Sequence, residues 1–188
     1  IAPDIIGWKD KEDNIYVFDE RTHQQLNPTN INDKIKIYER QVKDWFLNPA
    51  TNLIKYKNKN KGFIVLMICL SYLEGVEKYR LGRNERYGYS KCFFVNAMQR
   101  IYPNQFNSNQ LEDFYREARC GLFHNGMVDN RLIIDDDYER SLIFDGNDIK
   151  VSPAKFLNDI KDDFDNYISE LATNQELRNN FNGMYTNL

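Results

Sequence analysis

Hydrophobic and polar residues follow each other along much of the chain with the spacing of amphipathic helices. In residues 32–47 the apolar positions fall at i, i+3, i+7, i+10 and i+11, and they are Ile35, Tyr38, Val42, Trp45 and Phe46. This spacing places them on one face of a helix. Asn32 or Asp33 is suited to cap its start, and Pro49 predicts its end.

Three more helices are predicted before residue 126: residues 62–80, residues 89–102, and a helix that begins near Ser108 and runs through His124. The first half of residues 62–80 is apolar nearly all round, which is typical of a central buried helix. Gly75 lowers helix propensity there, so we expect close contact with another helix at this position. The apolar stripe of the last of the three is Leu111, Phe114, Tyr115, Ala118 and Leu122.

The period of the pattern changes after Gly126. Residues 131–135, 141–144 and 148–151 are short and rich in β-branched residues, and Asp145–Gly146 is a hairpin signal. We therefore predict a small β-hairpin insert over residues 131–151. Ser152 as N-cap and Pro153 at the first helical position then predict a long helix, and a shorter one is expected from Thr173.

The first 30 residues are mixed in character and are expected to be irregular, apart from a short strand at residues 14–18 and an exposed loop around His23. No internal repeat or low-complexity linker divides the chain. The predicted fold is thus mainly α, with one domain over residues 1–188. We expect an antiparallel bundle of four to five helices with the β-hairpin insert before the last long helix.

Composition limits the cellular setting. The formal charge of −3 argues against a protein that coats nucleic acid or anionic membranes by bulk charge. The longest apolar run, Phe63–Leu70, is far shorter than the ~20 residues of a membrane span, and the start of the sequence does not resemble a secretory signal. The three cysteines (Cys69, Cys92 and Cys120) form no CxxC pair. They predict buried, reduced thiols and a soluble cytoplasmic protein without a cysteine metal site.

Charge is unevenly distributed along the sequence. Residues 78–124 carry a net charge of +4, whereas residues 125–188 carry −7. The basic segment ends in the sequence RCGLFH, so an anion site there is electrostatically reasonable. The alternative is that alternating charge only keeps the fold soluble.

Arg119 and His124, within the sequence REARCGLFH, are the most suggestive pair in the chain. The planar fork of arginine matches a phosphate, and histidine can move a proton near neutral pH. On a regular α-helix, however, positions five apart differ by about 140° in direction, whereas Arg116 and His124 differ by about 80°. Either the helix loosens at Gly121, or a second subunit completes the cluster.

The spacing R-x4-H near the end of a late helix resembles the Rx4–6H motif of HEPN domains, which are small helical bundles. The preceding buried helix, the lead-in FYREARCGLFHNG, and the later hairpin and Pro-started helix agree with it, and the resemblance covers most of residues 32–172. It implies metal-independent RNA cleavage, in which the ribose 2′-OH attacks the adjacent phosphate and leaves a 2′,3′-cyclic phosphate. Arg119 and His124 would carry this chemistry where two subunits meet, in a toxin–antitoxin, antiphage-defence or RNA-processing setting.

The resemblance also leaves a second interpretation open. Cys120 stands where many active members have a polar residue, and some HEPN-like domains are dimerisation or interaction modules that partner a nucleotidyltransferase or another defence protein. Arg119 would then pair with a carboxylate on another helix, and His124 would simply lie near the helix end, with Gly126 as the cap. A catalytic pair needs both side chains exposed in a shared cleft. A small-ligand or nucleotide-binding bundle, with a closed apolar cavity elsewhere, is the third alternative.

Further contacts to RNA are predicted from the sequence YRLGRNERYGYSK. Its candidates for phosphate or RNA binding are Arg80, Arg83, Arg86 and Lys91, with Arg116 in the motif helix as a further one; the neighbouring tyrosines are Tyr79, Tyr87 and Tyr89. The alternative is an ordinary surface loop. Asp135, Asp136 and Asp137 are interpreted as surface acids beside a turn, and no metal or cofactor is predicted.

Overall fold

The computed structural model describes residues 1–56, 61–83, 89–127 and 130–185, and these are mainly helical, as predicted. The α-helices are α1 (Ile31–Val42), α2 (Asn48–Lys55), α3 (Lys61–Leu81), α4 (Ser90–Ile101), α5 (Ser108–Phe114), α6 (Pro153–Leu171) and α7 (Gln175–Met184). Two π-helical segments are η1 (Lys43–Leu47) and η2 (Tyr115–Asn125). Within the described residues, no helix combines the length and apolar character that a membrane crossing requires.

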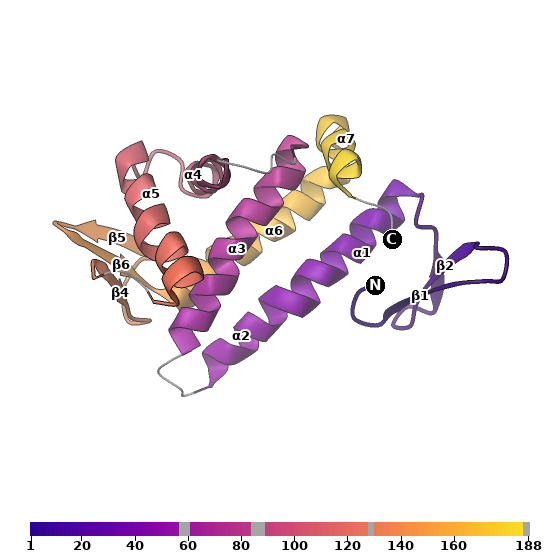
Figure 1. Ribbon diagram of the computed structural model, residues 1–188, viewed down its shortest axis with the longest axis horizontal. Helices are drawn as coiled ribbons and strands as arrows, with labels where there is room; N and C mark the ends of the chain where they lie inside the picture. The colour runs from indigo at the N-terminus through magenta and orange to yellow at the C-terminus, as the bar shows by residue number, and fades with distance from the viewer. Residues whose placement is uncertain (57–60, 84–88, 128–129, 186–188) are drawn as a thin grey trace.

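Helix α3 lies at the centre of the helical body and packs against α2, α4, α6, α7 and η2 (Figure 1). Its buried face is formed by Val65, Leu66, Cys69, Leu70 and Leu73, all at 0% exposure. α4 is seen end-on where α3 lies in the plane of Figure 1, so these two helices cross steeply. The helices around α3 therefore do not all align with it, unlike those of the predicted antiparallel bundle.

An ionic cluster joins α3, α4 and α6. Arg100 of α4 pairs with Glu77 of α3, with 3.0 Å between Nη2 and Oε2, and with Asp163 of α6. The hydroxyl of Tyr72 donates to the same Asp163 carboxylate at 2.7 Å. Because both carboxylates are buried, this pairing fixes α3 relative to its neighbours.

The first helix does not end at Pro49, and that prediction is wrong. α1, η1 and α2 follow one another without a break, with Pro49 at the second position of α2, directly after the π-helical turn. The wider turn of η1 also displaces the residues that follow α1 around the helix axis. Trp45 and Phe46, expected in the core, are consequently 49% and 47% exposed.

The N-terminal 30 residues do not form the irregular segment that the sequence predicts, so that prediction is wrong. They form an antiparallel sheet of β1 (Ile5–Lys9), β2 (Ile15–Asp19) and β3 (Gln24–Leu26). Asp13 and His23 take the positive φ angles that the two tight turns require, 63° and 53°. The predicted strand at residues 14–18 corresponds to β2, and His23 is exposed as expected. Asp and His side chains tolerate this left-handed conformation, so the turns were not marked by glycine.

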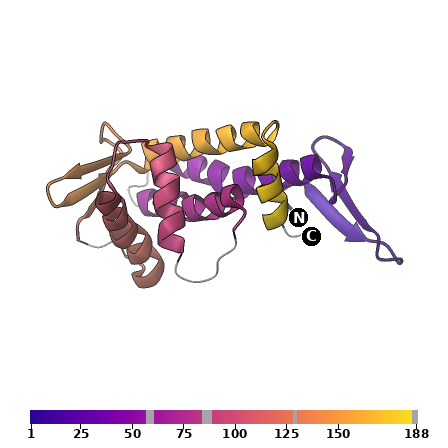
Figure 2. The ribbon, with the colours of Figure 1, turned by 90° about the horizontal axis from the view of Figure 1, so that it is seen from above.

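The C-terminal sheet lies at the opposite end of the elongated molecule (Figure 2). It consists of β4 (Leu132–Ile134), β5 (Leu142–Asp145) and β6 (Asp148–Val151) in the order β4-β6-β5. β5 and β6 form the predicted hairpin, with Gly146 at φ 59° in its turn. The parallel pairing of β4 with β6 was not predicted, because spacing along the chain does not reveal which strand joins a sheet edge.

One face of α3 is not covered by the other described residues. Ile64 is 51% and Phe63 39% exposed. The first half of this helix is therefore not buried all round, whereas its apolar sequence predicts that it is. An apolar groove of about 220 Å³ runs between α1, η1 and α3 and includes Phe46 and Gly75. A Cβ added to Gly75 would meet nothing within 4 Å. No contact within the described chain therefore requires a glycine here, contrary to expectation.

The cysteines match their prediction only in part. Cys69 is buried, whereas Cys120 is half-buried and Cys92 is exposed. Cys92 lies in the first turn of α4 and is exposed, although Phe93 and Phe94 beside it in sequence are buried. Burial raises the pKa of the Cys69 thiol far above its ordinary value, which keeps it protonated.

Candidate active site

The candidate site is built on the last helix before the C-terminal sheet. α5 begins with a capping box, in which Asn107 accepts from the backbone of Gln110 and the Gln110 side chain accepts from the backbone of Asn107. The helix continues from α5 directly into η2 and ends at Gly126, whose backbone is left-handed with φ 69°. In a π-helix the backbone hydrogen bonds join residues five apart. Positions five apart therefore lie close to one another, one turn above the other.

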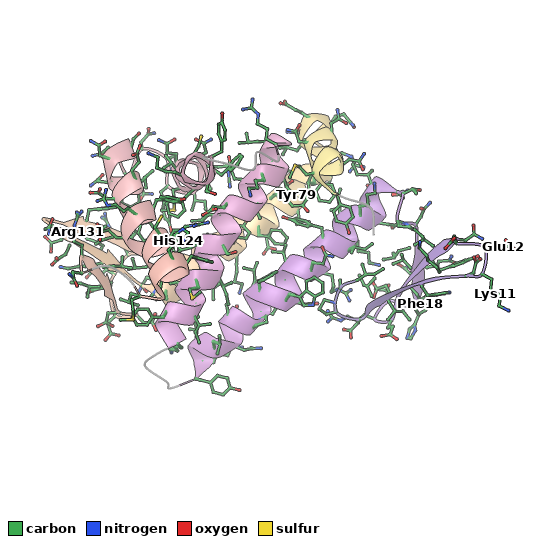
Figure 3. The ribbon with its side chains drawn as sticks, viewed as in Figure 1. Lys11, Glu12, Phe18, Tyr79, His124 and Arg131 are labelled. Carbon is green, nitrogen blue, oxygen red and sulfur yellow. The ribbon has the colours of Figure 1, made fainter. Side chains whose placement is uncertain are left out.

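This winding brings Arg119 and His124 together. The Nη1 atom of Arg119 lies 3.3 Å from Nε2 of His124. Of the two alternatives posed by the sequence, a loosened helix describes the structure, and the contact forms within one chain. Figure 3 shows His124 where η2 passes in front of α3, and its side chain is exposed.

Glu74 of α3 holds the other edge of the same guanidinium. Its two carboxylate oxygens accept from Nε at 2.5 Å and from Nη2 at 3.2 Å. Burial opposes the charge on Arg119, but the hydrogen bonds and the charge of Glu74 raise the pKa of Arg119 further above its ordinary value. The Nε–Nη2 edge is thus occupied, and the edge that carries Nη1 faces His124.

Two aromatic rings fix the position of the guanidinium. The Cζ atom of Arg119 lies 5.7 Å from the ring centroid of Tyr115 and 5.2 Å from that of Phe123. Burial raises the pKa of Tyr115, with the Arg119 charge acting in the opposite direction. Cys120, where a polar residue was expected, is half-buried beside the pair.

A hydrogen bond across this contact requires one particular tautomer of His124. Arginine has only donors, so a hydrogen bond from Nη1 needs a lone pair on Nε2. The proton of the neutral ring then lies on Nδ1. In this arrangement a partly buried permanent cation lies beside an exposed imidazole, which suits binding of an anion and transfer of one proton.

The structure does not bring the other predicted phosphate ligands to this pair. Arg116 pairs instead with Asp113 at 2.7 Å and Glu117 at 3.3 Å. Lys91 pairs with Glu112 at 2.7 Å. Arg83 is exposed beyond the end of α3, about 10 Å or more along the helix axis from Glu74 at 1.5 Å per residue. Arg86 lies outside the described residues.

The tyrosines predicted to stack on RNA are placed differently. Tyr79 packs in the aromatic core, with its ring 4.6 Å from that of Tyr38. Tyr89 is 49% exposed, whereas Tyr87 lies outside the described residues. The interleaved pattern of arginine and tyrosine therefore does not form one stacking surface, because α3 turns Tyr79 inward.

Sequence reasoning missed Glu74. The available signal was an acidic residue within a helix that is otherwise apolar, since a carboxylate in such a place needs a cationic partner. Among the described residues no cluster of three or more histidine, cysteine or acidic side chains could hold a metal ion. Asp136, one of the three consecutive acids, instead accepts from the backbone N–H of Ala154 at 3.0 Å, at the start of α6.

Comparison with known proteins identifies no relative: no family model, no curated protein and no solved structure matches the chain.

Proposed function

We propose that this protein is a metal-independent endoribonuclease of the HEPN type, with His124 as the acid/base and Arg119 as the phosphate ligand. The 3.3 Å contact between Arg119 Nη1 and His124 Nε2 supports this proposal most strongly. It places a permanent cation, itself largely covered, directly beside an exposed imidazole. These are the two groups that phosphodiester cleavage needs in the absence of a metal.

The mechanism follows from the two edges of the guanidinium. Glu74 occupies Nε and one hydrogen of Nη2, which leaves the Nη1 side for the oxygens of a phosphodiester. A ribose 2′-OH beside that phosphate would replace Nη1 at the lone pair of His124 Nε2, lose its proton to this nitrogen and attack phosphorus. The bond to the 5′-oxygen breaks, that oxygen takes up a proton from water, and a 2′,3′-cyclic phosphate remains. Arg119 stabilises the negative charge that builds up on the phosphoryl oxygens.

A homodimer in the cytoplasm is part of the proposal. The uncovered face of α3 carries Ile64 at 51% exposure and the groove at Gly75, which is next in sequence to Glu74, the partner of Arg119. A second copy placed on this apolar face would bring two Arg119–His124 pairs near each other, as the resemblance to HEPN domains implies. The same resemblance suggests a role in a toxin–antitoxin or antiphage-defence system, with an antitoxin or nucleotidyltransferase as protein partner.

The direct test is cleavage of a labelled structured RNA in EDTA by the wild type, Arg119→Ala and His124→Ala, at matched folding. The proposal predicts cleavage by the wild type that both substitutions abolish. Cleavage that survives both changes would assign the activity to a contaminant. No cleavage of several RNAs would reject the ribonuclease.

A non-catalytic HEPN-like interaction module is the second candidate, and the ion pair with Glu74 favours it. The side chain of Arg119 is only 20% exposed, and a carboxylate holds it by two hydrogen bonds. A purely structural arginine would show the same arrangement. The module predicts that Arg119→Ala lowers stability without any change in RNA cleavage, and that a tagged chain binds its partner equally well after His124→Ala.

A further inference from the structure

A polar cavity lies away from Arg119 and His124. It has a volume of about 420 Å³, which is in the range of small-molecule sites. Its walls come from the end of α4 with the turn that follows, from the start of β5, and from the first turns of α6. The residues that carry the argument are Tyr102, Phe106, Arg140, Ser141, Leu142 and Asp159.

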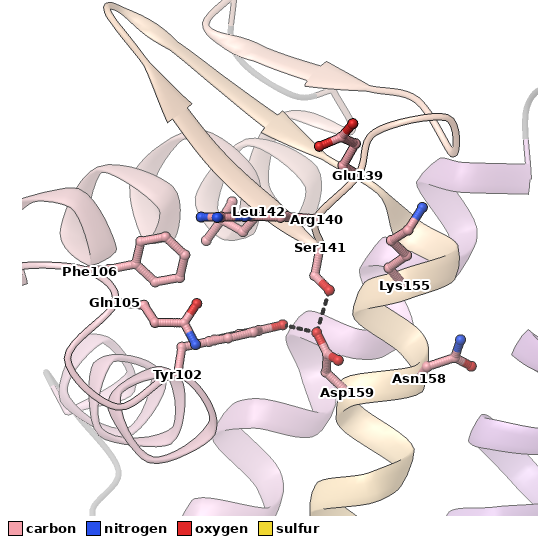
Figure 4. Close-up of a pocket in the computed structure, with 10 residues that line it drawn as sticks. All are labelled: Tyr102, Gln105, Phe106, Glu139, Arg140, Ser141, Leu142, Lys155, Asn158 and Asp159. Carbon is pink, nitrogen blue, oxygen red and sulfur yellow. Dashed lines mark hydrogen bonds between the residues drawn. The ribbon is translucent and has the colours of Figure 1, made fainter.

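Asp159 is fixed at the floor of this cavity. The hydroxyl of Tyr102 donates to Oδ2 at 2.5 Å, and the hydroxyl of Ser141 donates to the same oxygen. Figure 4 shows both bonds ending on one oxygen, so that Oδ1 is left for another donor. Tyr102 and Ser141 are 8% and 9% exposed. Two buried hydroxyls thus orient a carboxylate whose second oxygen can accept a hydrogen bond.

Aromatic and apolar groups form one side of the cavity. The ring of Tyr102 stacks on Phe156 with centroids 6.3 Å apart, and Phe106 meets Tyr102 edge-on at 5.6 Å. Burial and the bond to Asp159 raise the pKa of Tyr102 far above its ordinary value, so it remains a neutral donor. Phe106 and Leu142 provide apolar surface against which a planar ring can pack.

Arg140 supplies a cation at the mouth. Figure 4 shows its side chain pointing toward Phe106 and away from Asp159. It is exposed, and within the described part of the chain it forms no ion pair or hydrogen bond. Lys155 also lines the cavity, but its ammonium group donates to the carbonyl oxygen of Tyr138 at 2.6 Å. The cavity therefore has an acceptor at one end, an apolar wall, and a free guanidinium at the other end.

We infer that this cavity binds a nucleotide whose base carries an exocyclic amino group. The amino group would donate to Asp159, the base would lie against Phe106 and Leu142, and the phosphate would bind Arg140. Cytosine and adenine offer such an amino group, whereas uracil presents a carbonyl oxygen at the same position, which a carboxylate repels. The nucleotide is either free or a unit of single-stranded RNA. The inference does not rest on the proposed ribonuclease activity.

The test is calorimetric binding of CMP, UMP and cytidine to His124→Ala protein, so that no cleavage intervenes. We expect CMP to bind at least about tenfold more tightly than UMP, and more tightly than cytidine. Arg140→Gln, a change at an exposed side chain, should reduce the affinity for CMP to that for cytidine. Asp159→Asn should reverse the base preference, because its amide would accept from Tyr102 and Ser141 and donate to the carbonyl of uracil.

Competition between CMP and labelled oligo(C) RNA distinguishes a free nucleotide from a unit of single-stranded RNA as the ligand. Displacement of bound oligo(C) by CMP indicates a site for RNA nucleotides, whereas binding of CMP without oligo(C) indicates a free nucleotide. Equal binding of CMP and UMP would overturn the inference. The inference would also be overturned if neither the nucleotides nor the RNA bound at millimolar concentration. Full affinity for CMP in both Arg140→Gln and Asp159→Asn would overturn it as well.

Discussion

Arg119 and His124 meet at 3.3 Å although five positions separate them on one helix. On a regular α-helix these side chains would point about 140° apart. The π-helical winding of η2 removes that separation. π-helical turns are rare and often occur at functional sites, so the backbone geometry and the chemistry of the pair suggest the same role.

Arg119→Lys is expected to lower RNA cleavage by about 100-fold or more. A lysine carries one compact ammonium group, which cannot bind both oxygens of Glu74 and also face His124. Arg116→Lys is the matched control, because Arg116 is held by Asp113 and Glu117, and its cleavage should remain within a few-fold of the wild type. Initial rates on one RNA measure both. Equal losses in the two variants would contradict the role of Arg119 as the phosphate ligand.

Glu74→Gln should increase RNA affinity by about threefold and lower stability by about 1 kcal/mol. The neutral amide keeps the shape of the side chain but no longer competes with phosphate for the guanidinium. Fluorescence anisotropy in a His124→Ala background measures binding without cleavage. Glu112→Gln, which breaks the exposed pair with Lys91, is the control. Weaker binding after Glu74→Gln would mean that orientation of Arg119 by the carboxylate outweighs its competition with phosphate.

Gly75→Leu should disrupt the proposed dimer while the monomer stays folded. A Cβ added at this position meets no atom within 4 Å among the described residues, and replacement of a helical glycine generally adds stability. A second copy lying on the same face of α3 would collide with it. Gly183→Leu in α7 is a matched control, since its Cβ also meets nothing. Sedimentation velocity distinguishes the outcomes: a wild-type monomer, or a dimer that both variants retain, is incompatible with an interface at Gly75.

Asp19 should make stability depend on pH in the acid range. Burial alone would raise its pKa, but hydrogen bonds from Lys36 and Thr22, with the charge of Arg40, lower it to about 2 from its ordinary 3.8. Because the folded state has the lower pKa, the stabilisation is complete above pH 3.8 and is lost as the pH falls to about 2.

Asp19→Asn is therefore expected to cost up to about 2 kcal/mol at neutral pH and much less near pH 2. Urea unfolding at several pH values measures the difference. Asp13→Asn, at a carboxylate that is 90% exposed, is the control and should change little at any pH. A constant difference between Asp19→Asn and the wild type from pH 7 to pH 2 would rule out this ionic contribution.

The predicted helices correspond closely to those observed wherever one apolar face packs against the core. Residues 62–80 and 89–102 correspond to α3 and α4, and Ser152 and Pro153 mark the start of α6 as expected. The errors lie where the position of a side chain depends on backbone winding, or where a strand's place depends on sheet pairing. A sequence read at 3.6 residues per turn does not reveal η1 or η2, so the exposure of Trp45 and the contact of Arg119 with His124 both depended on geometry beyond the pattern.

The candidate site was predictable in its two motif residues and not in its surroundings. R-x4-H identified Arg119 and His124, but Glu74 lies 45 positions before Arg119 in the sequence, and no local spacing links the two. The basic residues near α4 illustrate the reverse case. Lys91 appeared suited to phosphate in the sequence, yet it faces Glu112, because a run of like charge does not indicate where opposite charges lie in the fold.

The most direct test of the central claim is the chemistry of the cut. The measurement compares an RNA that the protein cleaves in EDTA with the same RNA carrying one 2′-deoxynucleotide on the 5′ side of the mapped cleavage site. If Arg119 and His124 promote attack by the 2′-OH, the first RNA yields a 2′,3′-cyclic phosphate and the second is not cut at that position. Cleavage of the deoxy-substituted RNA at the same bond, or products with a 3′-OH, would contradict the account.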